Sequence, residues 1–208
     1  EVAPFTVDLL LPSGAENLNY VLYTDEYPYK MQREWLDRLP FDIYSVNVHT
    51  GAKRLIGRSY RTAPKWSVNG KWAVMYDPIA QVWNKFDGAT GKVVNISDAI
   101  GYPMFMESYD KPAPAPAYGI AGWTADGNNV FLYDAYDWWK IDLTGERQPE
   151  CLTKGYGRKH GKSIRKMTSN IDKDVFQKDE KVIVSLWDKD TMDEGVYQLD
   201  MKGRLRKL

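Results

Sequence analysis

One glycine- and lysine-rich segment resembles a phosphate-binding loop in its residue types. It reads Gly155-Tyr156-Gly157-Arg158-Lys159-His160-Gly161-Lys162-Ser163. A phosphate-binding loop needs a glycine five positions before its Gly-Lys pair, and Tyr156 stands at that position. The strand-then-helix context of the motif is also missing. The segment therefore predicts a solvated loop between repeated units rather than a nucleotide site.

One serine lies in a sequence that approaches the nucleophile motif of serine hydrolases. That motif is G-x-S-x-G, a strained turn from a strand into a helix that exposes the serine hydroxyl. The segment Gly57-Arg58-Ser59-Tyr60-Arg61 lacks the second glycine and lies between predicted strands. The two histidines, His49 and His160, fall in predicted turns or loops and have no metal-ligand spacing. The sequence therefore assigns no catalytic residue to this chain.

Two acidic groups imitate cation sites. Asn170, Asp172 and Asp174 are spaced like the start of a calcium loop, but Val175 replaces the glycine that such a loop requires. Lys181 stands where the bidentate glutamate belongs. The second group, predicted to be a charged hairpin loop rather than a metal cage, consists of Asp188, Asp190, Asp193 and Glu194. No metal, cofactor-binding residue or cofactor is predicted.

The charge balance argues against a nucleic-acid partner. Lys and Arg total 28 and Asp and Glu total 28, so the chain has no net field to hold a polyanion. Arg165 and Lys166 extend the glycine- and lysine-rich segment into a local basic cluster, which we predict to be a surface loop. The single cysteine, Cys151, has no partner for a disulfide within the chain and is predicted to be a buried small hydrophobe.

The chain has no predicted membrane span. A spanning helix needs about twenty apolar residues, whereas the apolar run Leu9-Leu10-Leu11 stops at Pro12. The first residues, Glu1-Val2-Ala3-Pro4, contain neither an initiator methionine nor a signal peptide. We therefore expect the chain to be a processed or excised piece of a longer protein.

A hairpin signature organises the chain. An aromatic or apolar strand runs into an Asn or Asp, a glycine follows three or four positions later, and a second strand begins at a basic residue. The four copies are 43–53, 82–92, 138–147 and 196–204. The Asx side chain can bond the turn backbone and the glycine accepts a positive φ, so each copy predicts a hairpin. The spacing indicates a unit of about 40–50 residues with insertions.

A second hairpin precedes the first one in the middle repeats. Residues 65–76 match residues 122–133 at an offset of 57, and each contains an Asn-Gly or Asp-Gly turn before an apolar strand. The last repeat keeps that strand as 181–187 after a turn-like 178–180, and the first keeps it as 20–24 after 13–17. The two hairpins together give four strands per repeat.

Tandem four-stranded units predict an all-β fold of the β-propeller type. A sandwich or an up-and-down barrel would not repeat such a unit with the same landmarks. We predict one propeller portion over residues 1–208, with blade-like repeats at about 5–57, 64–98, 118–153 and 164–207. We expect an arc of a larger propeller, whose open blade edges favour self-association.

Two insertions and one aromatic pair complete the prediction. Met31, Trp35 and Leu39 have the spacing of one apolar stripe on a short helix. Residues 111–116, which alternate Pro with Ala after Lys111, predict an extended polyproline-like connector on the surface. Trp138 and Trp139 should face opposite sides of a strand, one in the core and the other towards a neighbouring blade, the pore or a ligand.

Parts of the sequence resemble known propellers. Residues 66–72 resemble a WD40-like repeat element, with Val68 and Asn69 in place of Pro and Asp. More specifically, residues 118–126 and 132–140 are similar to the propeller of large bacterial S9 (prolyl oligopeptidase family) serine peptidases, and residues 32–40 are similar in the same way. In that family the propeller is joined to an α/β-hydrolase domain that holds a Ser-Asp-His triad, and no triad residue transfers to this chain.

The resemblance implies a function for the parent protein. This chain would be the non-catalytic propeller portion of a serine peptidase, a hydrolase, which gates access of peptide substrate and docks the missing hydrolase domain. It also implies a periplasmic or secreted location. The alternative is a free-standing TolB/WD40-like propeller that binds proteins in the cell envelope. A third class, a glycan-processing propeller, would need paired carboxylates and an Arg cluster in the pore, and the repeats identify no such set.

Overall fold

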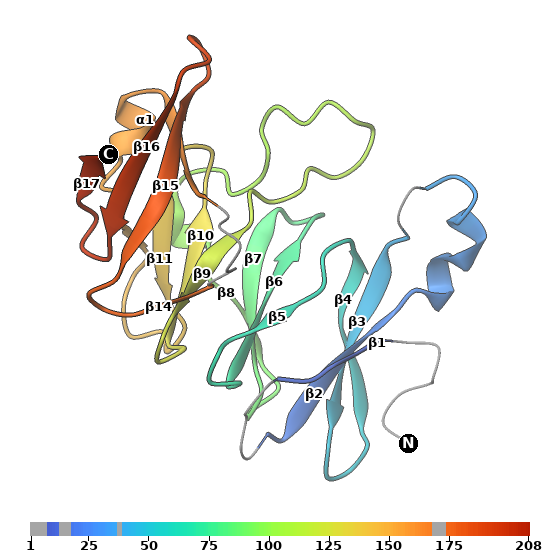
Figure 1. Ribbon diagram of the computed structural model, residues 1–208. Coiled ribbons are helices and arrows are strands. Elements are labelled where there is room, and N and C mark those ends of the chain that lie inside the picture. The colour runs from blue at the N-terminus through green and yellow to red at the C-terminus, as the bar shows by residue number, and fades with distance from the viewer. Residues whose placement is uncertain (1–7, 13–17, 37–38, 168–173) are drawn as a thin grey trace. The chain divides into compact units, whose positions relative to one another are not determined.

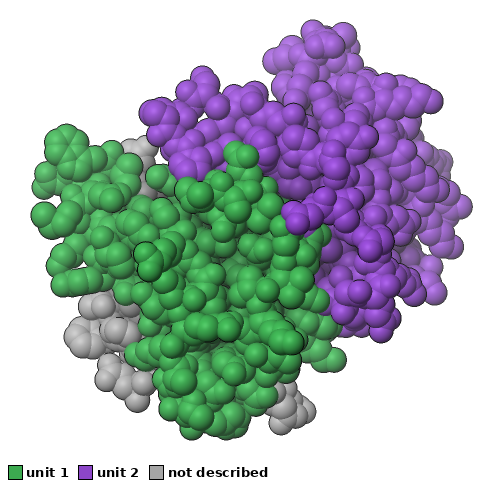
Figure 2. Space-filling model, turned by 180° about the vertical axis from the view of Figure 1, so that it is seen from behind, with its two compact units in different colours: residues 1–96 green, residues 97–208 purple. Residues whose placement is uncertain are grey.

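The computed structural model describes residues 8–12, 18–36, 39–167 and 174–208. Strands account for 45% of them and helices for 7%, far below the helix content of an average globular protein. The chain divides into two compact units, residues 1–96 and 97–208 (Figures 1 and 2). The low helix content confirms the all-β prediction.

The unit of residues 1–96 contains two four-stranded antiparallel sheets, each with its strands in sequence order. The strands of the first sheet are β1 (Asp8–Leu10), β2 (Tyr20–Asp25), β3 (Phe41–Asn47) and β4 (Lys53–Tyr60). Those of the second are β5 (Lys65–Trp66), β6 (Trp72–Asp77), β7 (Val82–Asp87) and β8 (Val93–Asn95). Leu22 and Ile43 of the first sheet share one buried cluster with Met75 and Phe86 of the second. The two sheets are therefore packed face to face.

The unit of residues 97–208 repeats this arrangement. The antiparallel strands of its first sheet are β9 (Ile120–Thr124), β10 (Asn129–Tyr133), β11 (Trp138–Asp142) and β12 (Glu150–Cys151). Those of its second sheet are β13 (Lys162–Lys166), β15 (Lys181–Asp188), β16 (Glu194–Asp200) and β17 (Leu205–Lys207). Phe131 and Trp138 of one sheet share a buried cluster with Val184 and Leu199 of the other. Four such blade-like sheets confirm the predicted propeller class.

One short strand does not follow the repeat. β14 (Val175–Phe176) directly precedes β15 in the sequence but pairs in parallel with β9 of the other sheet. The strand that pairs with β15 at the start of the second sheet is β13. Gly122 of β9 permits this close approach, because a Cβ atom there would lie 2.5 Å from the Phe176 ring and 2.6 Å from the Asp174 carbonyl oxygen. The repeat pattern did not predict this exchange of strands between the two sheets.

The four predicted hairpin turns are confirmed. Their glycines, Gly51, Gly91, Gly145 and Gly203, have φ values of +70°, +69°, +86° and +81°. The Asx side chain that precedes each glycine accepts hydrogen bonds from backbone N–H groups of its own turn; the four are Asn47, Asp87, Asp142 and Asp200. The same local chemistry therefore closes the outer hairpin of every sheet.

The prediction for the first insertion is wrong in its details. The helix is a 3-10 helix, η1 (Tyr27–Gln32), which ends before Trp35. Met31 and Trp35 are 82% and 83% exposed, and only Leu39 is buried. A 3-10 helix has three residues per turn, so residues four apart do not share a face and no apolar stripe forms.

The second unit begins with a long arm before its first strand. After η2 (Asp98–Ile100) the chain runs outwards and then turns back towards β9. The two halves of this arm are joined where Met106 N–H donates to the Pro116 carbonyl oxygen at 2.8 Å. The proline-rich connector is the returning half of this arm (Figure 1). The third helix, α1 (Tyr156–Lys159), has one turn. No helix within the described ranges is long and apolar enough to cross a membrane.

Candidate functional site

Ser59 lies in a strand and is held by a buried carboxylate. It is the penultimate residue of β4, with φ of +57°, and its backbone N–H donates to Asp42 Oδ1 at 3.1 Å. The Tyr29 hydroxyl donates to the same oxygen at 2.6 Å. Burial raises the pKa of Tyr29, and the bond to Asp42 raises it further, so this phenol stays a proton donor. The cluster connects the η1 insertion to the first sheet.

A second carboxylate, Asp134, organises the β10–β11 turn. It is fully buried and its Oδ1 accepts the backbone N–H groups of Tyr136 and Asp137 at 2.7 and 2.5 Å. Its Oδ2 accepts Trp139 Nε1–H at 3.1 Å and Arg158 Nη2–H at 2.9 Å. Both oxygens are thus occupied by the protein itself, which offsets the cost of burying the charge.

The glycine- and lysine-rich segment is not the solvated loop that the sequence predicted. Asp137 accepts hydrogen bonds from Gly157 N–H at 2.9 Å, from Arg158 N–H at 3.0 Å and from the Thr153 hydroxyl at 2.6 Å. Its carboxylate therefore occupies the N–H groups of α1 that an external anion would need. A Cβ atom at Gly157 would lie 2.7 Å from the carbonyl oxygens of Tyr136 and Lys162, so the segment is packed tightly onto the turn.

The predicted surface position of Arg165 is also wrong. Its guanidinium donates to the carbonyl oxygens of Asp134 and Ala135 at 2.7 and 3.1 Å, and it lies 4.7 Å from the centre of the Tyr133 ring. Burial lowers the pKa of Arg165. Lys166 pairs with Asp174 at 2.5 Å. The basic cluster is therefore part of the packing between the two sheets of this unit.

The aromatic pair lies as the strand geometry requires. Trp138 is fully buried in the core, and Trp139, 9% exposed, lines a hollow of about 380 Å³ together with Tyr102 and Arg158. The Arg158 guanidinium lies 3.9 Å from the centre of the Tyr102 ring. Cys151 also lines this hollow and accepts Gly155 N–H at 3.2 Å, and burial raises its thiol pKa, so the thiol is poorly suited to be a nucleophile.

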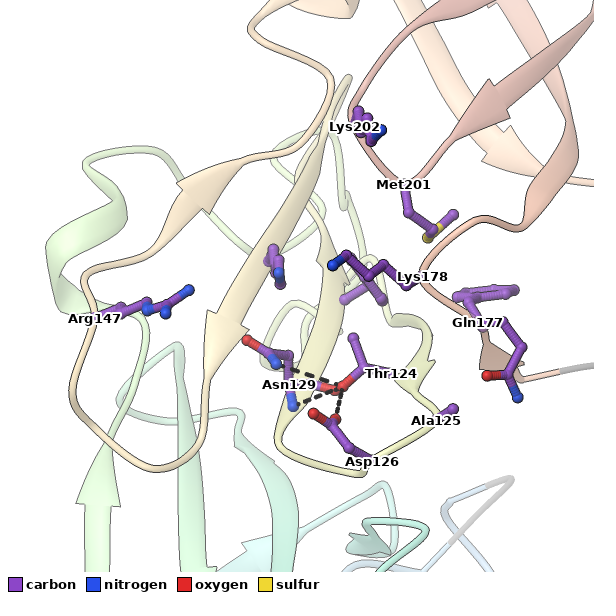
Figure 3. Close-up of a pocket in the computed structure, with 12 residues that line it drawn as sticks. Thr124, Ala125, Asp126, Asn129, Arg147, Gln177, Lys178, Met201 and Lys202 are labelled. Atoms are coloured by element: carbon purple, nitrogen blue, oxygen red, sulfur yellow. Dashed lines mark hydrogen bonds between the residues drawn. The ribbon is translucent and has the colours of Figure 1, made fainter.

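A larger hollow of about 480 Å³ lies at the turns of the same unit (Figure 3). We call it the basic pocket; it is lined by Thr124, Ala125, Asp126, Asn129, Phe131, Lys140, Arg147, Phe176, Gln177, Lys178, Met201 and Lys202. The Thr124 hydroxyl donates to Asp126 Oδ1 at 2.5 Å and accepts Asn129 N–H at 3.0 Å. The bond from the Thr124 hydroxyl lowers the pKa of Asp126, the one carboxylate among the described lining residues.

The remaining predicted residues occupy separate places. His49 contacts Asn19 in a hairpin turn, and His160 packs on Tyr156. Asp188 accepts the N–H groups of Asp190 and Thr191 and so closes the β15–β16 turn. Asn170 and Asp172 lie outside the described residues, as does the predicted first turn at 13–17. Within the described ranges, no group of three or more His, Cys, Asp or Glu side chains is arranged to hold a metal ion.

No role was predicted for the buried carboxylates Asp42, Asp134 and Asp137. A signal for two of them was present, because Asp134-Ala135-Tyr136-Asp137 places an Asx residue at each end of a two-residue turn between apolar strands. The basic pocket had no comparable signal, since its cations are 62 positions apart at the extremes, Lys140 and Lys202.

No protein-family model and no curated protein matches this chain. Several solved structures are similar to it. One is acylaminoacyl peptidase in complex with Z-Gly-Gly-Phe-chloromethyl ketone, at 14% identity and a TM-score of 0.42, which matches 100% of this chain and 33% of that chain. The uncomplexed acylaminoacyl peptidase of Pyrococcus horikoshii gives 14% identity and a TM-score of 0.42, with 96% and 32% covered.

A third similar structure is the β-propeller domain of the Trilobed protease from Pyrococcus furiosus. It has 12% identity and a TM-score of 0.37, with 98% of this chain and 71% of that chain covered. The chain spans about a third of the length of the acylaminoacyl peptidases. Similarity at this level identifies no family for the chain.

Proposed function

We propose that this chain is the non-catalytic β-propeller portion of a serine peptidase of the prolyl oligopeptidase family. In this role it gates the access of peptide substrate and docks an α/β-hydrolase domain. The parent protein would be a hydrolase, while this portion supplies no catalytic group. The proposal includes a periplasmic or secreted location, which rests on the sequence resemblance alone.

One observation carries the proposal. The segments that resemble the S9 propeller, 118–126 and 132–140, form β9, β10, β11 and the turn with the buried Asp134 and Asp137. The resemblance therefore falls on residues that build a blade rather than on residues that could perform hydrolysis. Ser59, whose neighbourhood approaches the elbow motif, lies in β4, whose next element is the strand β5 rather than a helix.

The test is covalent labelling with a fluorophosphonate, which reacts with activated serines. We expect no labelling of the 208-residue chain and strong labelling of the parent protein, whose reading frame should continue beyond Leu208 into a G-x-S-x-G segment. A Ser59→Ala variant is the matched control, because any labelling that it abolishes would locate an activated hydroxyl on the propeller and contradict the proposal.

Gating has a separate readout in the parent protein. If the propeller restricts access, kcat/KM for short peptides should exceed that for an unfolded protein bearing the same cleavage sequence. Equal values would contradict gating. A parent reading frame without a hydrolase segment would instead favour a free-standing protein-binding propeller.

A further inference from the structure

The basic pocket is formed by turns that the topology brings to one end of two sheets. In an antiparallel sheet with sequential strands, the turn between the first two strands and the turn between the last two lie at the same end. The β9–β10 turn supplies Thr124 and Asp126, the β11–β12 loop supplies Arg147, and the β16–β17 turn supplies Lys202. Gln177 and Lys178 directly follow β14 and also line the basic pocket. Because β14 runs parallel to β9, they lie at the same end of the sheet as the β9–β10 turn and complete the rim of the pocket.

The lining has an excess of positive charge in a chain whose net charge is zero. Lys140 acts on Asp126 and contributes to lowering its pKa. Arg147, Lys178 and Lys202 remain, and within the described ranges no carboxylate forms an ion pair with any of their side chains. The described lining therefore holds four cationic side chains and one carboxylate, Asp126, and this excess of positive charge favours an anionic ligand.

The inner wall of the basic pocket is apolar. Phe131 and Phe176 are 1% and 3% exposed, and Met201 packs against the same core cluster. A volume of about 480 Å³ is within the range of small-molecule sites, which are mostly apolar with a few polar groups that fix orientation. A ligand that satisfies both the wall and the rim carries an apolar group beside its negative charge.

We propose that the basic pocket binds a small monoanionic carboxylate that bears an aromatic or branched apolar side chain. The side chain lies against Phe176 and Met201, and the carboxylate faces Arg147, Lys178 and Lys202. Asp126 disfavours a dianion such as phosphate, because its own charge lies in the same lining. The proposal concerns residues 97–208 alone and does not depend on a peptidase parent.

The test is a titration of the full chain with N-acetylphenylalanine, followed by amide NMR. N-acetylphenylalaninamide is the matched neutral probe. We expect saturable shifts at Thr124, Gln177, Lys178 and Lys202, with the amide binding at least about tenfold more weakly because three exposed charge contacts are each worth a few-fold. Equal binding of the two probes, or shifts confined to other residues, would overturn the proposal.

Variants that remove one positive charge test whether the rim residues Lys178 and Lys202 cause the preference for the carboxylate. Lys178→Gln and Lys202→Gln should each weaken binding of the carboxylate about two- to fivefold and leave binding of the amide unchanged. Lys92→Gln, an exposed lysine of the other unit, is the control and should change neither. Met201→Ala should weaken both probes alike. If Lys92→Gln had the same effect as Lys178→Gln, the attraction would be nonspecific and the proposal would fail.

The carboxylate could belong to a free metabolite or to the end of a peptide. A pentapeptide ending in phenylalanine, with and without C-terminal amidation, separates these sources. Binding of the free-acid peptide alone would identify a peptide C-terminus as the ligand, and binding of N-acetylphenylalanine without either peptide would identify a free small carboxylate. Failure of all free acids to bind would overturn the proposal.

Discussion

The two sheets of the unit 97–208 have similar topology but differ in how many of their faces are buried. In β10 consecutive residues, which face opposite sides, are all buried: Val130, Phe131, Leu132 and Tyr133 are 0%, 1%, 0% and 8% exposed. In β15 burial alternates, since Val182 and Val184 are 8% and 0% exposed while Ile183 between them is 39% exposed. One sheet is covered on both faces and the other on one.

This difference distinguishes the features of a sheet that follow from the repeated sequence from those that depend on the structure packed against the sheet. Both sheets end in an Asx–Gly hairpin in which the Asx side chain accepts the N–H two residues further on, so this feature of the turns follows from local sequence. The strands differ because a sheet that is covered on both faces takes a continuous apolar run, whereas a half-covered sheet takes an alternating one. The burial of Asn129–Tyr133 is continuous and that of Lys181–Asp188 alternates, although Val182, Ile183 and Val184 of the second strand are all apolar.

The largest expected effect is the loss of a large side chain from the doubly covered sheet. Phe131→Ala and Leu132→Ala remove side chains on opposite faces of β10, and each should destabilise the chain by about 3–5 kcal/mol in urea unfolding because both leave cavities. Ile79→Ala, at a residue that is 67% exposed, is the control and should change stability by less than about 0.5 kcal/mol. A small effect of Leu132→Ala beside a large effect of Phe131→Ala would show that one face is open in solution.

Much of the fold could be predicted because its strongest signals are local. The four hairpin turns depend on an Asx residue and a glycine a few positions apart, and the Lys65–Tyr76 and Gly122–Tyr133 matches depend on one turn each. The position of β14 could not be predicted, because pairing with β9 depends on space above Gly122, about fifty residues away. The η1 error has a similar origin, since a four-residue spacing cannot distinguish an α-helix from a 3-10 helix.

The sites were predicted less well, because burial decides what a polar residue does. Arg165 and the segment around Gly157 appear basic and solvated in the sequence, yet carbonyl oxygens and the carboxylate of Asp137 occupy their donors. Asp134 and Asp137 lie within residues 132–140, where the family resemblance assigns neither carboxylate a role. The basic pocket needs four separate turns, so only the topology assembles it.

The second prediction compares two neighbours on β15. Val184→Ala should cost about 2 kcal/mol, because the side chain is fully buried, whereas Ile183→Ala should cost less than about 1 kcal/mol. Urea unfolding measures both. An equal cost would mean that the outer face of this sheet is covered in solution. Sedimentation velocity of the wild-type chain at micromolar concentration would then show whether self-association, which stays a prediction, provides the cover.

The smallest expected effect distinguishes the outer hairpins of the two sheets. Burial raises the pKa of Asp142, but the bonds from Thr144, Arg147 and Glu146 outweigh it, so its pKa lies below that of an ordinary aspartate. For Asp200 burial is likewise outweighed, first by Arg204 N–H and then by the Arg204 side chain, whose Nε lies 2.6 Å from Oδ2. Both folded-state pKa values are depressed, so each carboxylate stabilises the fold at neutral pH, and that contribution is lost as the pH falls through the folded-state pKa.

Salt should change the pKa values of Asp142 and Asp200 by different amounts, because it screens an exposed ion pair more than it weakens hydrogen bonds to backbone N–H groups. Raising the ionic strength from about 0.05 to 0.5 M should move the Asp200 pKa upwards and leave the Asp142 pKa nearly unchanged, as measured by carboxyl NMR titration. Arg204→Gln should raise the Asp200 pKa in the same direction, without an effect on Asp142. If Asp142 responded as strongly as Asp200, the difference between the two hairpins would not lie in the Arg204 ion pair, and their turns would be electrostatically equivalent.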